Sequence, residues 1–229
     1  MRGSKLPAAG VFAVAMAWME AATVVYLRSL VNRINPYQIH PLPFAVLPAW
    51  VELVREAATL LLLLSVAWLA GTAWRNRSGY FLFAFGIWDI FYYIFLKVIV
   101  GWPKTLFDWD VLFLLPVPWW GPVLAPMLIS LLMVLGGILL SRNSANRIDN
   151  HPRRLSWLLC LAGIFTLLYL FMQNSLMASL EGNETVQNLL PTNFHWALFV
   201  IALCLAAFPI FDIAVRFAAQ HKSRSLEHS

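Results

Sequence analysis

The chain has 229 residues, of which 61% are hydrophobic and 12% charged, and its formal net charge is +5 at neutral pH. Soluble domains are close to half apolar and a quarter charged, so a soluble fold would leave much of this apolar surface uncovered. The basic residues lie between apolar segments and form no patch, which excludes nucleic acid as a partner. The sequence therefore predicts an all-α, polytopic integral membrane protein with a single transmembrane domain.

Apolar runs long enough to cross a bilayer recur along the chain, because about 20 helical residues cover about 30 Å. We expect six spans, at residues 8–31, 48–74, 80–100, 122–140, 155–177 and 194–219. An alternative is that residues 6–19 belong to a signal peptide, with Ala15 and Ala17 at the small positions of its cleavage site. Cleavage there would leave five spans. The apolar stretch continues well past that point, which favours a first transmembrane helix.

Lys and Arg residues alternate in number between successive predicted loops. The chain ends and the predicted loops 75–79 and 141–154 hold Arg2, Lys5, Arg75, Arg77, Arg142, Arg147, Arg153, Arg154, Arg216, Lys222 and Arg224. The remaining loops hold only Arg33 and Lys104. Basic loops stay on the cytoplasmic side, so we expect both termini in the cytoplasm and the protein in the plasma (inner) membrane.

The segment 101–121 differs from the rest of the chain. Its apolar run 111–115 is too short to cross a bilayer, and its prolines prevent one regular helix. Its four Trp residues suit the headgroup level. We expect an interfacial or re-entrant element over the outer end of the bundle, serving either as a membrane anchor or as a lid on a pocket.

Ionisable residues inside the predicted spans are the most informative feature of the sequence. Each costs about 3 kcal/mol to insert into hydrocarbon, so such residues face a protein interior or a wet cavity. Along the first three spans they recur at helical spacings of three, four or eight residues, which places acid and base on one face of each helix. By depth they belong to the midplane and outer half of the membrane. The predicted binding pocket comprises Glu20, Arg28, Glu52, Arg55, Glu56, Asp89, Tyr93 and Lys97.

The same residues could instead form a network that fixes helix packing, because polar side chains also join transmembrane helices. His40, Gln173, Asn174 and His195 belong to the outer ends of other segments and are further candidates for the pocket. Asp212 is expected to pair with Arg216, four residues on.

The sequence predicts no metal and no cofactor. Three basic residues among the four acids compete with a cation, and no histidine is placed inside a span to complete a metal site. Paired histidines for haem are missing, as are the common nucleotide-binding and hydrolase motifs. Cys160 and Cys204 lie in apolar runs without a metal-binding or redox spacing.

Three functional classes follow from these features. The first is a non-catalytic subunit or assembly component of a larger membrane complex, whose partners are membrane lipids and other membrane-protein subunits. The second is an enzyme acting on a lipid or lipid-linked substrate from the outer leaflet, with Glu56 or Asp89 as general acid or base and Arg28, Arg55 and Lys97 binding an anionic head group. The third is a small-solute or proton-coupled transporter using Glu20 and Asp89. The sequence favours the first class and leaves open whether the protein is an enzyme.

Overall fold

The computed structural model describes residues 5–30, 32, 34–38, 49–114, 117–142, 153–182 and 189–227. Within these ranges, six helices are long and apolar enough to cross a membrane, which confirms the predicted all-α polytopic class. They are α1 (Leu6–Leu30), α2 (Ala49–Ala70), α3 (Trp74–Val100), α4 (Leu124–Arg142), α5 (Arg154–Glu181) and α7 (Trp196–Glu227).

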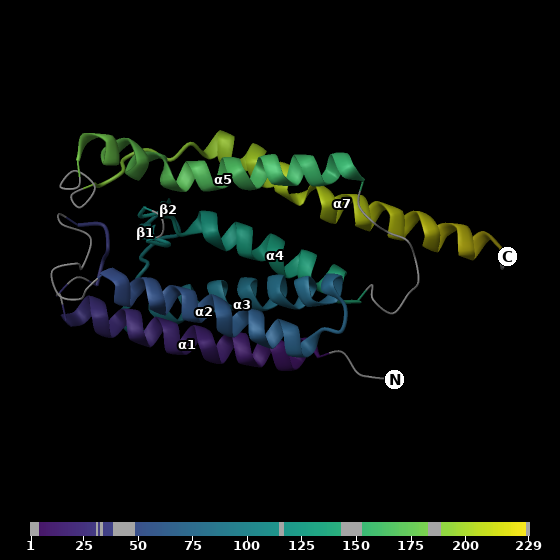
Figure 1. Cartoon of the computed structure of the whole chain (residues 1–229), viewed down its shortest axis with the longest axis horizontal. Coiled ribbons are helices and arrows are strands. Elements are labelled where there is room, and N and C mark those ends of the chain that lie inside the picture. Colours follow the sequence, from purple (N-terminus) through teal and green to yellow (C-terminus); the bar gives the residue numbers. More distant parts are fainter. Residues whose placement is uncertain are drawn as a thin grey trace.

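The helices form two groups that lie along one common direction (Figure 1). In the first group α3 packs against α1, α2 and α4; in the second α5 packs against α7. The start of α1 and the end of α7 lie at the same end of the molecule (Figure 1). At the opposite end, the start of α4 and the end of α5 contact a short two-stranded sheet.

The turn between α2 and α3 comes earlier than the sequence predicted. The structure ends α2 at Ala70 and starts α3 at Trp74, so Arg75 and Arg77 lie in the first turn of α3, within the predicted loop 75–79. The three-residue turn is tight, because a Cβ at Gly71 would lie 2.6–2.8 Å from atoms of Arg77. The Arg77 guanidinium also stacks over the Trp68 ring at 3.6 Å. Apolar periodicity alone reveals none of these contacts.

The segment between α3 and α4 contains the two-stranded sheet. Strands β1 (Trp109–Val111) and β2 (Trp120–Pro122) pair antiparallel, with Asp110 opposite Gly121. Asp110 and Trp120 are each 1% exposed, so this hairpin packs into the protein. Two of the Trp residues expected at the headgroup level, Trp102 and Trp120, are therefore buried by protein, and the hairpin lies over one end of the bundle (Figure 1).

Glycines let α3 and α4 approach closely. A Cβ at Gly137 of α4 would lie 2.5 Å from the backbone nitrogen of Phe83 and 2.7 Å from the carbonyl oxygen of Gly79. Small residues at such crossings are typical of membrane helices, whose association relies on close packing. Because α3 carries part of the candidate site and α4 another part, this contact sets the width of the space between them.

We predict that Gly137→Ala lowers the stability of the folded protein by about 1–3 kcal/mol, the usual cost of overpacking against atoms that cannot move aside. Gly10→Ala in α1 is the matched control, because its Cβ would meet the Phe83 side chain at an ordinary 3.5 Å. Unfolding in a mild detergent measures both variants. Equal stability of the two variants would contradict close backbone contact at Gly137.

Candidate functional site

A cavity of about 520 Å³ lies between the two groups of helices. Its wall includes residues of α1, α2, α3, α4, α5 and α7 and of the hairpin segment. Seven of the eight residues predicted to form the pocket belong to this wall: Glu20, Arg28, Glu52, Arg55, Glu56, Asp89 and Tyr93. The structure thus brings together side chains from three helices that the sequence could only place at similar depths.

Arg55 is held between two glutamates. It forms an ion pair with Glu20 of α1, and its Nε donates a hydrogen bond of 2.8 Å to Glu52 on its own helix. The second carboxylate oxygen of Glu20 accepts a hydrogen bond of 3.1 Å from Thr59 Oγ1. Glu20 and Glu52 are 9% and 7% exposed. Because two buried carboxylates surround one guanidinium, the group as a whole is formally negative and does not favour an anionic ligand.

Arg28 is engaged in the same way at the end of α1. Its NH2 lies 2.7 Å from Asp110 Oδ1, and its guanidinium stacks over the Trp102 ring at 4.6 Å. Burial raises the pKa of the Asp110 carboxyl, and the neighbouring Arg28 opposes this effect by favouring the charged form. The ion pair joins α1 to the hairpin and neutralises an acid that the protein would otherwise bury alone.

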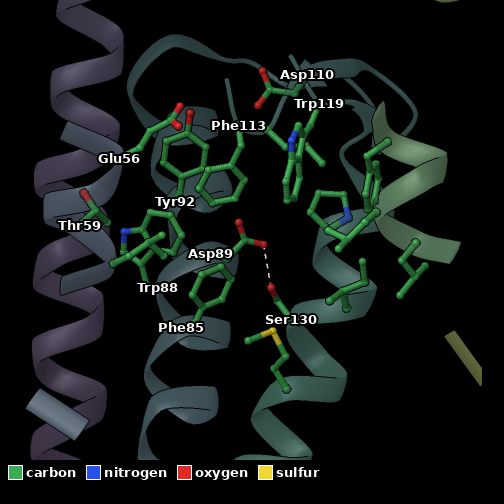
Figure 2. Close-up of a pocket in the computed structure, with 18 of the residues that line it drawn as sticks. Glu56, Thr59, Phe85, Trp88, Asp89, Tyr92, Asp110, Phe113, Trp119 and Ser130 are labelled. Carbon is green, nitrogen blue, oxygen red and sulfur yellow. Dashed lines mark hydrogen bonds between the residues drawn. The ribbon is translucent and has the colours of Figure 1, made fainter. Parts of the chain in front are cut away.

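Two carboxyl groups of the cavity wall lack an ion-pair partner among the described residues. Glu56 of α2 accepts hydrogen bonds of 3.2 and 3.4 Å from the backbone N–H of Leu114. Asp89 of α3 accepts one of 2.8 Å from Ser130 Oγ of α4. Figure 2 shows both side chains, together with the Asp89–Ser130 hydrogen bond. These two groups are the ones available to a ligand or to proton transfer.

Aromatic rings surround these carboxyls. Phe85, Trp88 and Tyr92 of α3 and Phe113 and Trp119 of the hairpin segment all belong to the cavity wall. Adjacent rings contact one another, with centroids 5.3 Å apart for Phe85 and Trp88 and 5.3 Å for Phe113 and Trp119. Figure 2 shows the Asp89 carboxyl among the rings of Phe85, Tyr92 and Phe113.

The rest of the cavity wall is apolar. It is built by the facing sides of α4, α5 and α7, away from the hairpin, and among its described residues none is charged. Its members include Leu132, Met133, Gly136, Leu140, Trp157, Cys160, Ile164, Leu203, Ala206, Pro209 and Ile210. The cavity therefore has a polar, aromatic end near the hairpin and an apolar remainder.

Lys97 is the predicted site residue that does not belong to the described cavity wall. Its Nζ donates a hydrogen bond of 2.7 Å to the carbonyl oxygen of Pro103 and contacts the carbonyls of Gly101 and Lys104 at 3.4 Å. A cation at the C-terminal end of a helix is favourably placed for such carbonyls. Lys97 thus holds the chain where it leaves α3.

The other candidates also lie elsewhere. Gln173, Asn174 and His195 are absent from the described wall, and His40 lies outside the described residues. Asp212 pairs with Arg216 at 3.1 Å, as expected, and also accepts hydrogen bonds from the Arg153 N–H and from Ser156 Oγ. Within the part of the chain that the structure describes, no group of three or more His, Cys, Asp or Glu residues is arranged to hold a metal ion.

Several residues of the site were not among those predicted. Asp110 lies in the segment 101–121, outside the predicted spans. The signal that could have found it is its position between the apolar residues Trp109 and Val111. Ser130 and Trp119 carry no sequence signal, because their role depends on which helix faces α3.

Comparison with protein-family models, with curated proteins and with solved structures found no match for this chain.

We predict that Asp110→Asn lowers stability by about 3–5 kcal/mol, because it leaves the Arg28 guanidinium without a counter-charge in a buried place. Arg28→Gln should lower stability by a similar amount, because it leaves the buried Asp110 carboxylate without a counter-charge. The double variant Arg28→Gln/Asp110→Asn should be more stable than the sum of the two losses predicts, by at least about 1 kcal/mol. Denaturation of all four proteins in the same detergent gives the comparison. Strictly additive losses would show that the two residues do not depend on each other.

Proposed function

We propose that the protein binds a lipid-like amphiphile, with the head group at the polar, aromatic end of the cavity and the chain along α4, α5 and α7. The observation that carries this proposal is the division of one cavity wall into a charged part and a long apolar part. Ligand sites combine apolar walls with a few placed polar groups, and cavities of about 300–1,000 Å³ are typical of them.

The charge distribution supports this function over transport. All charged residues of the described wall lie between the level of Glu20 and Asp89 and the hairpin, and the wall beyond that level is apolar. A carrier for a small polar solute needs polar groups along a path to both sides, since unpaired polar groups are costly in hydrocarbon. The apolar chain of an amphiphile needs no polar groups along the wall that it contacts.

The positive-inside rule supports an orientation for this site. Arg75 and Arg77 belong to the first turn of α3, which lies at the same end of the bundle as the end of α4 and the start of α5. With that basic end in the cytoplasm, the hairpin and the polar end of the cavity face the outside of a plasma membrane. The amphiphile would then come from the outer leaflet.

Catalysis on the bound amphiphile is a second candidate function. The observation that favours it is that Glu56 and Asp89 line one cavity with different partners, a backbone N–H and a hydroxyl group. Carboxyl groups in different environments can serve as general acid and general base. The alternative is that the protein is a subunit of a larger complex, in which case the cavity and its charged residues serve only the packing of the helices.

We expect native mass spectrometry of the gently extracted protein to show a co-purifying amphiphile, and Met133→Trp to remove it. Met133 lies on the apolar wall, so an indole there fills the space that the chain would occupy. Leu135→Trp is the control, because Leu135 lies on the same helix but is 51% exposed, away from the cavity. A stoichiometric protein partner with no amphiphile, unchanged by Met133→Trp, would favour the subunit role and contradict the proposal.

A further inference from the structure

We infer that the cavity selects an amphiphile with a cationic head group, such as an amine or a quaternary ammonium. This inference rests on the proposed function and adds the chemical class of the ligand. It reverses the expectation from the sequence that Arg28, Arg55 and Lys97 would bind an anionic head group.

The first support is the charge of the wall. Its described residues include five carboxyl groups and two guanidinium groups, a formal charge of −3. Both guanidinium groups are already paired, Arg55 with Glu20 and Glu52 and Arg28 with Asp110. An anionic head group would have to displace a buried carboxylate from one of these pairs, which is costly because it leaves that carboxylate without a counter-charge.

The second support is where the remaining acids lie. Glu56 and Asp89 form no direct ion pair among the described residues. Asp89 accepts a hydrogen bond from the Ser130 hydroxyl, and Glu56 accepts one from the Leu114 N–H and also interacts electrostatically with Arg55. One oxygen of Asp89 accepts the bond from Ser130, and the carboxyl lies in the cavity wall (Figure 2). A bound cation would supply the counter-charge that Asp89 lacks and a second counter-charge for Glu56, which otherwise shares Arg55 with Glu20 and Glu52.

The third support is the aromatic lining, which is independent of the charges. The rings of Phe85, Trp88, Tyr92, Phe113 and Trp119 line the same end of the cavity as the two carboxyls (Figure 2). Aromatic faces attract cations, and cages of such rings recognise quaternary ammonium groups. A phosphate or sulfate gains nothing from these faces.

The experiment exposes the purified full-length protein, in a neutral detergent, to three probes that share one chain and differ in head group. The probes are dodecyltrimethylammonium, dodecyl maltoside and dodecyl sulfate, and native mass spectrometry measures the fraction of protein that retains each one. We expect the cationic probe to be retained at least about tenfold more tightly than the neutral one. Asp89→Asn and Glu56→Gln should each remove most of this preference while binding of the neutral probe persists.

Both substitutions keep the shape of the side chain and an oxygen that accepts the hydrogen bond from Ser130 or Leu114. Glu181→Gln is the control for charge alone, because this exposed acid at the end of α5 is not part of the described wall. Equal retention of all three probes, or preference for the sulfate, would overturn the inference yet leave the proposed function standing if Met133→Trp abolishes retention. Retention that is insensitive to Met133→Trp would overturn both.

Discussion

The structure of this protein depends on how buried ionisable groups find counter-charges in an environment that solvates them poorly. The Arg28–Asp110 pair shows this most clearly, because it joins the end of a transmembrane helix to a hairpin more than 80 positions later in the chain. Neither group could be buried alone without a cost of several kcal/mol. The pair therefore fixes the hairpin over the cavity, and Glu56 completes the attachment through the Leu114 N–H. The hairpin that covers the polar end of the cavity is therefore held in place by charged residues that also line the cavity.

The spans could be predicted from the sequence because the bilayer imposes one length and one composition on every crossing helix. The boundaries followed less well where local contacts decide them. The turn after α2 depends on the absence of a side chain at Gly71 and on the stacking of Arg77 over Trp68, and α3 therefore begins six residues before its predicted start. The hairpin was expected only as an interfacial or re-entrant element and not as paired strands, since its strands are three residues long and pair across a proline-rich segment.

The site could be predicted in outline because helical spacing shows which residues of one helix share a face. Spacing cannot show which residue of another helix lies opposite. The charged residues predicted for the pocket were four acids and three bases: Glu20, Arg28, Glu52, Arg55, Glu56, Asp89 and Lys97. The described wall of the cavity differs from this set in two ways, because it includes Asp110 and does not include Lys97. These two differences make the described wall more acidic than the predicted set of residues, and they support the proposed cationic head group over the anionic one expected from the sequence. The net charge of the cavity wall depends on which residues face one another across the helices, and the sequence alone does not show this.

The cavity also bears on how the two groups of helices are held together. Near the hairpin they are joined by protein contacts, among them the 2.6 Å hydrogen bond from Ser175 Oγ to the carbonyl oxygen of Pro118. Along the apolar part of the wall α4 also packs against α7, since a Cβ at Gly136 would lie 2.7 Å from Ile210 Cδ1, and the cavity occupies the space beside this contact. An amphiphile in that space would touch both groups and bury apolar surface of each. Any ligand that binds only the folded protein stabilises it, by about 2.7 kcal/mol at a concentration one hundred times its dissociation constant. Occupancy of the cavity would therefore strengthen the packing between the two helix groups, which links the stability of the bundle to the presence of its ligand.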